Sequence, residues 1–397
     1  MEENKNGLNK LLVIIFLVLI GLGAGIGGFV LGKNQVKEKV ITINKVAEEK
    51  EKWKLPNASG KIVPILEDGK LMIYDRQSKK LIDSGIKNLS SGGAMGYGEE
   101  LPLLSPDGKY VAFINQNEGS KLYLLVAGSL EKIKLTDYAV SYLTDWSPDS
   151  QKILYYTDRP QTIVNRKESE GMGDFKPWEG KEVFEKESIN GFRLFNLSSG
   201  DDISLYPLLG AEGFVDSNRI WTLADSTEKQ NEQRMVVFNI NTFEADYSLV
   251  ANQIPFGGHQ ITFDSLGKKW AYMDNPTSGT EGSMLVKIAD FPSREGTIID
   301  TGKWAEVQMP KITLDGKYVS YLKRGEKIGD GRYEQLTVVW DTGLKKEVRT
   351  IKGFSKSWID NQTLIVNRND LGSNNQSFQG NKFFLVNVVT GEEEKIN

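Results

Sequence analysis

Short apolar runs alternate with compact polar turns along most of this chain. The sequence Ser-Pro-Asp-Gly-Lys at 105–109 precedes the apolar run Tyr-Val-Ala-Phe at 110–113, and Ser-Pro-Asp-Ser at 147–150 precedes Ile-Leu-Tyr-Tyr at 153–156. Apolar runs of this length, bounded by Gly, Pro, Asp and Asn, are typical of β-strands joined by tight turns. Weaker copies of the same phrase begin at Asp216, Asp264, Leu314 and Asp360.

A second phrase follows each first one and consists of an apolar strand, a short polar turn and another strand. It occurs seven times, beginning at Leu71, Leu122, Phe192, Val236, Leu285, Val338 and Phe384. The phrases recur at intervals of about 40–50 residues, with one longer interval, and a four-stranded unit of this size is a propeller blade. The pattern therefore predicts an all-β fold over residues 61–397, a β-propeller of seven four-stranded blades with six as the alternative. The unit near 61–85 is the weakest copy, because its opening strand is not evident.

The run from Leu104 to Phe113, followed by Leu122 to Val126, resembles the TolB-like, WD-type propeller repeat. As an architecture the resemblance covers residues 61–397, although only the units at 105 and 147 contain the full Ser-Pro-Asp phrase. Similar blades occur in TolB, a periplasmic interaction protein, and in the non-catalytic propeller of prolyl oligopeptidase relatives. The resemblance implies the fold and is nearly silent on function, because the Gly and Asp of the phrase form turns.

The N-terminal part of the chain has a different pattern. Residues 11–31 contain no charged side chain, and a helix of that length spans about 30 Å, the thickness of a bilayer's hydrocarbon core. We expect a short tail at 1–10, an uncleaved transmembrane signal anchor at 11–31 and a linker at 32–60. A cleaved signal peptide is the alternative, although its apolar region is usually shorter.

Membrane topology and pairing of the anchor follow from weaker signals. Lysines flank the apolar run on both sides, so the positive-inside rule gives no clear orientation. A single N-terminal anchor commonly exports the domain that follows, and we therefore expect a single-pass protein of the cell membrane with an extracytoplasmic propeller. Gly21 and Gly25 have the small-xxx-small spacing that lets two helices approach, so a helix–helix dimer is one outcome and an unpaired glycine-rich span is the other.

Composition excludes several functions. The chain has 49 Lys and Arg against 53 Asp and Glu, a net charge of −4, so we expect no nucleic-acid partner. With no cysteine and a single histidine, His259, thiol catalysis and cysteine-based metal sites are excluded. No Gly-x-Ser-x-Gly, calcium-loop or phosphate-loop motif is present. We therefore predict no catalytic residue, no metal ligand and no cofactor.

Long connections offer the best candidate site. Those at 159–190, 225–233, 274–282, 324–334 and 368–381 each follow the second strand of a unit, so they should gather on one face of the propeller. The first carries Phe175, Trp178 and Phe184 among many charges, as expected either of a partner-binding lid or of a solvated excursion.

Two functions remain open at this stage. The first is a non-enzymatic, membrane-anchored scaffold that binds another protein or a cell-envelope ligand through Phe175, Trp178 and Phe184, and binds the lipid bilayer through residues 11–31. The alternative is a glycan-active hydrolase or lyase with carboxylates at the mouth of the propeller channel, because carboxylate pairs are recognised by their separation in space and not along the sequence.

Overall fold

The computed structural model describes residues 53–67, 69–87, 89, 102–157, 191–205, 211–225, 233–242, 244–250, 261–275, 283–303, 306–329, 332–369 and 381–397. The chain divides into two compact units, Met1–Lys54 and Leu55–Asn397, and all the described strands lie in the second. The predicted anchor at 11–31, with Gly21 and Gly25, lies outside the described residues. Within those residues, no helix combines the length and the apolar character needed to cross a membrane.

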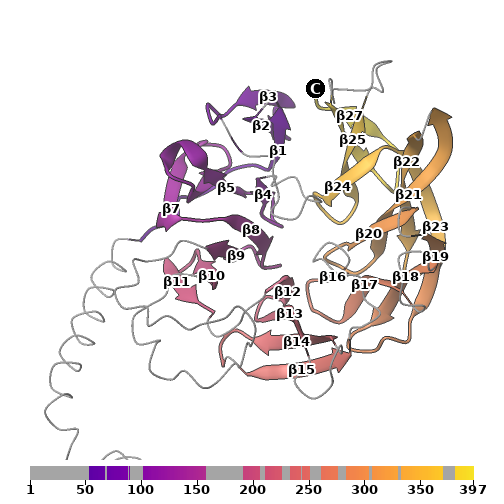
Figure 1. Ribbon diagram of the computed structural model, residues 1–397. Coiled ribbons are helices and arrows are strands. Elements are labelled where there is room, and N and C mark those ends of the chain that lie inside the picture. Colours follow the sequence, from indigo (N-terminus) through magenta and orange to yellow (C-terminus); the bar gives the residue numbers. More distant parts are fainter. Residues whose placement is uncertain are drawn as a thin grey trace, which may run out of the picture. The chain divides into compact units, whose positions relative to one another are not determined.

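Residues from Leu55 onward form the seven-bladed β-propeller that the repeat predicts, with each blade an antiparallel sheet whose strands follow chain order (Figure 1). Among the described residues, blades 2 to 7 have four strands each, and blade 1 has three. A 3-10 helix, η1, occupies Gln116–Glu118.

The strands of the blades are as follows. Blade 1 comprises β1 (Ile62–Glu67), β2 (Lys70–Asp75) and β3 (Lys80–Asp83); blade 2 comprises β4 (Leu103–Leu104), β5 (Tyr110–Asn115), β6 (Lys121–Val126) and β7 (Lys132–Ala139); blade 3 comprises β8 (Tyr142–Trp146), β9 (Lys152–Thr157), β10 (Gly191–Asn196) and β11 (Asp201–Ser204); blade 4 comprises β12 (Gly213–Asp216), β13 (Arg219–Asp225), β14 (Gln233–Asn239) and β15 (Ala245–Val250); blade 5 comprises β16 (Ile261–Phe263), β17 (Lys269–Asp274), β18 (Ser283–Asp290) and β19 (Thr297–Lys303); blade 6 comprises β20 (Val307–Ile312), β21 (Tyr318–Gly329), β22 (Arg332–Asp341) and β23 (Lys346–Lys352); blade 7 comprises β24 (Phe354–Trp358), β25 (Thr363–Asn369), β26 (Asn381–Asn387) and β27 (Glu393–Lys395).

The recurring turn phrase is built from a hydroxyl and a carboxylate. The Ser105 hydroxyl accepts the Tyr110 N–H (2.9 Å) and donates to Asp107 (2.7 Å). Thr313 does the same in blade 6, bonding the Tyr318 N–H (3.0 Å) and Asp315 (2.6 Å). The glycine that follows each Asp has a positive φ, 76° at Gly108 and 70° at Gly316. The phrase therefore serves to form turns, as the sequence indicates.

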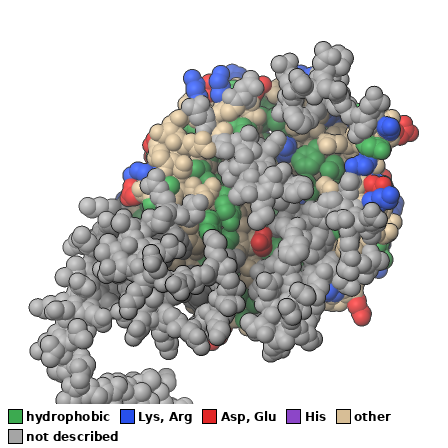
Figure 2. All heavy atoms as spheres, in the orientation of Figure 1, with side chains coloured by type: hydrophobic (Ala, Val, Ile, Leu, Met, Phe, Trp, Pro, Cys, Tyr) green, Lys and Arg blue, Asp and Glu red, His purple; other side chains and the backbone are tan. Residues whose placement is uncertain are grey.

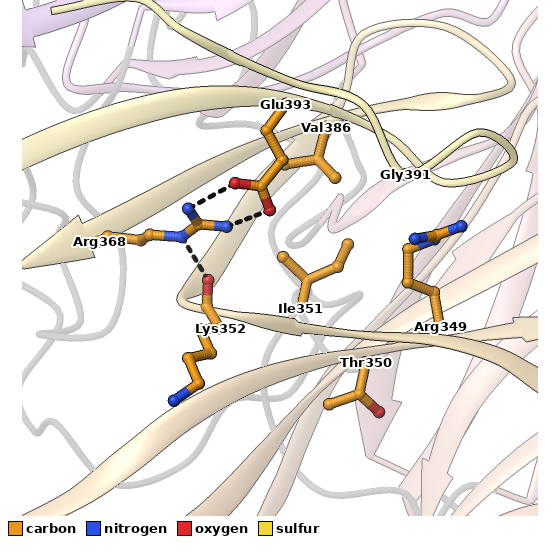
Figure 3. Close-up of a pocket in the computed structure, with 8 residues that line it drawn as sticks. All are labelled: Arg349, Thr350, Ile351, Lys352, Arg368, Val386, Gly391 and Glu393. Atoms are coloured by element: carbon orange, nitrogen blue, oxygen red, sulfur yellow. Dashed lines mark hydrogen bonds and ion pairs between the residues drawn. The ribbon is translucent and has the colours of Figure 1, made fainter.

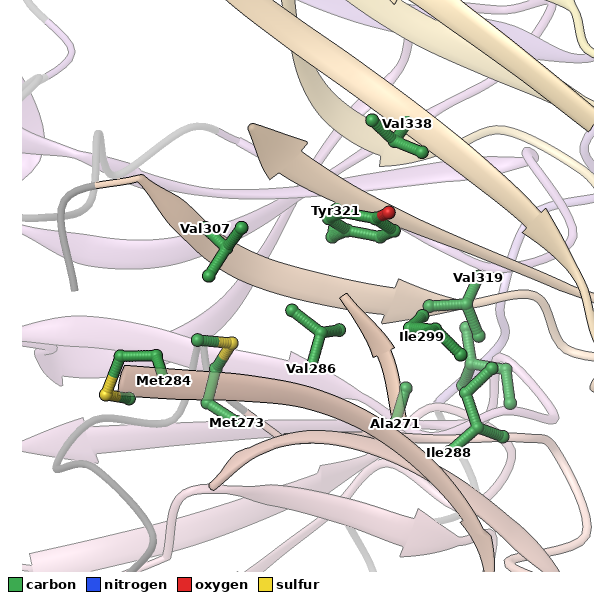
Figure 4. Packing of buried hydrophobic residues seen from close by; sticks show 11 residues of the cluster. Ala271, Met273, Met284, Val286, Ile288, Ile299, Val307, Val319, Tyr321 and Val338 are labelled. Carbon is green, nitrogen blue, oxygen red and sulfur yellow. The ribbon is translucent and has the colours of Figure 1, made fainter. Parts of the chain in front are cut away.

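Blade-to-blade packing of apolar side chains holds the ring together. Met273, Met284 and Val286 of blade 5 pack against Val307 and Val338 of blade 6, with each of the five almost fully buried (Figure 4). Other buried clusters join blades 1 and 2, 3 and 4, 4 and 5, and 6 and 7. At each of these junctions the facing sheets share a buried apolar cluster, which holds neighbouring blades together.

The ring closes through side chains where blade 7 meets blade 1. Val63 and Ile65 of β1 belong to the same buried cluster as Ile365 of β25 and Leu385 of β26. Around this cluster Arg76 pairs with Asp360 (2.9 Å). Blade 7 keeps its own four strands, so no strand is exchanged across this junction, which we call the closing seam.

Within the described residues, no strand of blade 1 pairs with the edge of β1 that faces away from β2, and a proline lies at this open edge. The Ile62 N–H bonds the Gly108 carbonyl (3.0 Å) and not β2. Alternate residues of a strand direct their backbone groups to the same side, so Pro64 lies at this open edge as well. Proline has no N–H, and the edge therefore lacks a donor that an added strand would need.

In each four-stranded blade, the second strand ends and the third begins at the same face of the propeller, which we call the loop face, because successive strands of an antiparallel sheet run in opposite directions. The prediction of a loop at 324–334 is wrong. β21 runs to Gly329 and β22 begins at Arg332, and the two strands pair as a long hairpin. The tip of this hairpin extends beyond the other two strands of blade 6. The pairing of β20 with β21 ends at Lys323, and the pairing of β23 with β22 ends at Leu336.

Candidate functional site

The sequence-predicted partner-binding residues Phe175, Trp178 and Phe184 belong to the connection between β9 and β10, and they lie outside the described residues. His259 also lies outside them. What the structure does describe is the support for this connection: β9 and β10 pair in register over their full lengths, with Gly191 opposite Thr157 at the loop face. The partner-binding lid therefore remains a prediction, and the two strands that flank it, β9 and β10, form a regular hairpin.

Polar atoms of the innermost strands bind the neighbouring blade. The Asp145 carboxylate of β8 accepts the Trp146 N–H (2.8 Å) and, from blade 4, the Phe214 N–H (3.0 Å). The Thr262 hydroxyl of β16 accepts the Ile312 N–H of blade 6 (3.0 Å). These two inner-strand groups are thus engaged in structural hydrogen bonds between blades.

The same arrangement continues at two other junctions. The indole N–H of Trp146 donates to the Leu103 carbonyl of blade 2 (2.9 Å), and that of Trp358 donates to the Lys311 carbonyl of blade 6 (3.0 Å). The Lys311 ammonium donates to the Lys356 carbonyl of blade 7. We refer to the contacts of Trp146, Asp145, Thr262, Lys311 and Trp358 as the inner ring.

Burial shifts the protonation of two members of the inner ring. Desolvation raises the pKa of Asp145 to about 6, against the lowering effect of its two backbone hydrogen bonds. Desolvation also lowers the pKa of Lys311 to about 8, assisted by the nearby positive charge of Lys356. Strongly shifted groups are candidates for catalysis, but both ring groups here have hydrogen-bond partners within the protein.

A buried polar cluster joins blades 2 and 3. Tyr155 of β9 donates to Asp202 of β11 (2.6 Å) and shares a hydrogen bond with Tyr138 of β7 (2.8 Å). Arg193 of β10 completes the cluster through Asp202 (2.9 Å). Burial is the main cause that raises the pKa of both tyrosines, so they stay neutral, and the cluster fastens the two blades together.

A groove lies between the outer parts of blades 6 and 7, with a volume of about 360 Å³ (Figure 3). Its floor is the apolar pair Ile351 and Val386, with Arg349 and Arg368 on opposite sides of Ile351. The Arg368 guanidinium is paired with Glu393 through both terminal nitrogens (2.7 and 2.6 Å). Sequence analysis did not identify this groove, because its walls come from β23, β25 and the turn before β27.

Both groove arginines are held in fixed positions. Arg368 stacks on the Phe384 ring (4.3 Å) and donates from Nε to the Lys352 carbonyl (2.8 Å). Arg349 donates from Nε to the Val388 carbonyl (2.8 Å). Gly391 makes room for it, because a Cβ at this position would lie 2.2 Å from the Arg349 guanidinium. The groove therefore presents two oriented guanidinium groups, the geometry that suits a carboxylate or phosphate.

The described residues offer no set of side chains arranged to bind a metal ion. Across the described ranges, no group of three or more His, Asp or Glu side chains converges as metal ligands would. The inner-strand carboxylates Asp145 and Asp216 are occupied, the first by backbone N–H groups and the second by Arg219 (2.7 Å). The groove and the loop face are thus the better candidate sites.

The seven antiparallel sheets define the class of this fold, a β-propeller, and comparison with known proteins shows what the chain is similar to. No protein-family model and no curated protein matches this sequence. Among solved structures, the propeller domain of the Trilobed protease from Pyrococcus furiosus, described as having an open velcro topology, is 15% identical with a TM-score of 0.49 over 85% of this chain and 93% of that one. TolB from Acinetobacter baumannii is 11% identical with a TM-score of 0.44, over 83% of this chain and 76% of TolB.

A third similarity is more limited. The chain covers 30% of the length of the Pyrococcus horikoshii acylaminoacyl peptidase, at 14% identity and a TM-score of 0.34 over 45% of its own residues. None of these similarities assigns an activity to this chain.

Proposed function

We propose that this protein is a membrane-anchored, extracytoplasmic propeller that binds another protein or a cell-envelope ligand and has no catalytic activity. The observation that carries this proposal is the inner ring. Polar groups at the centre of the propeller bind the adjacent blade, as Asp145 does with Phe214 (3.0 Å). Such contacts make a rigid platform, on which binding residues are commonly carried by loops. Long connections such as 158–190 meet the propeller at its loop face.

The anchor part of the proposal rests on the apolar run at 11–31 and is tested in membranes. We expect the full chain to resist carbonate extraction and external protease to reach the propeller in intact spheroplasts. A soluble form that begins near residue 28 would instead show that the segment is a cleaved signal.

The binding part is tested by shortening the β9–β10 connection. Replacement of residues 160–189 by a short Gly/Ser bridge should leave the melting temperature nearly unchanged, because loop length affects closure entropy by only about 0.6 kcal/mol per doubling. It should weaken the capture of a partner cross-linked in native membranes. Trp178→Ala with Phe175→Ala should reproduce part of the loss, since aromatic side chains dominate interface energies.

A matched control uses exposed apolar residues on the opposite face. Leu266 and Leu344 are 62% and 63% exposed, and they lie in turns between first and second and between third and fourth strands. Leu266→Ala with Leu344→Ala should leave capture intact. Equal loss in both double variants would show that the loop face is not the binding surface.

One observation favours the alternative of a glycan-active hydrolase or lyase. Asp145 is an inner-strand carboxyl whose pKa, raised to about 6 by burial, falls in the range that a general acid requires. Turnover of acidic or neutral oligosaccharides that disappears in Asp145→Asn, with the melting temperature retained, would support this alternative and overturn the scaffold.

A further inference from the structure

The long β21–β22 hairpin carries positive charge and an exposed aromatic ring on one of its sides. Lys327 is paired in register with Tyr333, which places the two side chains on the same side of the hairpin. Arg324 lies over the Tyr333 ring at 4.4 Å. Tyr333 is 40% exposed, and neither Arg324 nor Lys327 has an acidic partner among the residues that the structure describes.

This side of the hairpin continues into the groove between blades 6 and 7. Alternate residues of a strand share a side, so Tyr333 lies on the same side as Thr337 and Val339. Ile351 and Arg349 of β23 are paired with those two residues. We call the surface formed by Arg324, Lys327, Tyr333, Arg349 and Arg368 the basic face. Figure 2 shows Lys and Arg side chains, interspersed with Asp and Glu, along the right-hand rim, the side on which Figure 1 places β21, β22 and β23.

Two other charges of the hairpin are already neutralised, whereas Glu326 of β21 is an exposed carboxylate between Arg324 and Lys327. Lys323 pairs with Asp300 (2.7 Å) and Glu334 pairs with Lys352 (2.9 Å). Within the groove, Glu393 is the carboxylate that occupies Arg368, and its side chain is 40% exposed. An incoming carboxylate can therefore replace Glu393 on Arg368 without exposing a buried group, because the released Glu393 side chain returns to water.

We propose that the basic face binds an acidic, extended segment of a partner protein; this inference rests on the proposed scaffold function and names the chemistry of its partner. Carboxylates spaced along such a segment meet Arg324 and Lys327 on the hairpin and Arg368 in the groove. The exposed Tyr333 ring adds an apolar contact of the kind that protein interfaces favour. Charge complementarity of this sort sets specificity and association rate.

The test uses the full chain in detergent and a fluorescein-labelled peptide in which Glu alternates with Ser. We expect binding to be followed by anisotropy, to weaken with added salt, and to be absent for the same peptide with Gln in place of Glu. Arg324→Ala with Lys327→Ala should weaken peptide binding at least about tenfold, equivalent to about 1.4 kcal/mol. The control variant Lys70→Ala with Lys80→Ala removes the same charge from exposed positions of blade 1 and should change the affinity for the peptide little.

Three results would overturn the proposal. They are no binding of the Glu peptide, equal weakening in both double variants, and tighter binding of an oligoglucuronate that shows the same dependence on Arg324 and Lys327, which would assign the face to an anionic glycan. Partner capture from native membranes distinguishes a failure of the basic-face proposal from a failure of the proposed scaffold function. Capture that is unaffected in the Arg324 and Lys327 variant overturns only the basic face, whereas no capture by the unaltered protein overturns the scaffold.

Discussion

At the scale of single residues, Asp145 links pH to stability. Its folded-state pKa of about 6 lies above the value of about 3.9 expected in the unfolded chain, so the folded protein binds the proton more tightly. The free energy of unfolding should therefore fall as the pH rises from about 4 to 6, by about 2–3 kcal/mol relative to Asp145→Asn. Chemical denaturation of both proteins across this pH range measures the difference.

Asp75 provides the control of opposite sign. Its carboxylate accepts the N–H groups of Ser78 (2.6 Å) and Gln77 (2.9 Å), and the Ser78 bond is the main cause that lowers its pKa. The stability difference between the unaltered protein and Asp75→Asn should therefore rise with pH through the acid range. A difference of the same sign for both residues would contradict the assigned environment of Asp145.

Residues that act within one turn could be predicted from the sequence, whereas those that act between blades could not. The Ser and Asp of the turn phrase bond neighbours two to five positions away, and the sequence shows those neighbours directly. The partner of Asp145 is Phe214, separated from it by 69 positions, and it is set by the packing of blade 3 on blade 4. No local spacing indicates such a contact.

At the scale of elements, the turn between β26 and β27 fastens blade 7 to blade 6. Gly391→Ala should destabilise the protein by more than Gly85→Ala, although both glycines have a positive φ, 82° and 74°. A Cβ at Gly85 meets no atom within 4 Å, so its cost is backbone strain of about 1 kcal/mol. At Gly391 the Arg349 guanidinium must also move. Thermal unfolding of the two variants tests this, and equal shifts would show that Arg349 adapts freely.

The hairpin of blade 6 shows where element prediction reaches its limit. Residues 324–334 are rich in charge and glycine, a composition that favours a loop. The structure pairs Arg324 with Gln335 and Lys327 with Tyr333, so the apolar part of each strand extends into a polar ribbon. Pairing between the two strands makes residues 324–334 a hairpin, and the pattern of apolar and polar residues along the chain does not reveal such pairing.

At the scale of the whole molecule, the closing seam should be as important as any other junction between blades. Ile65 is packed into the seam and Ile73 into the junction between blades 1 and 2, and both are at most 1% exposed. Ile65→Ala and Ile73→Ala should each cost about 2–5 kcal/mol and lower a single unfolding transition. A much smaller effect of Ile65→Ala, or a separate early transition, would mean that the ring opens at the seam.

The closing seam also imposes an order of events on synthesis. Arg76 and Asp360 are 284 positions apart, whereas the pairings within each blade are local along the chain. Blade 1 must leave the ribosome and wait, with Val63 and Ile65 uncovered, until blade 7 has been translated. Pro64 shields the waiting edge from strand addition during that interval. By removing one N–H donor from the open edge of β1, Pro64 thus protects the nascent chain at the stage when that edge is most exposed to aggregation.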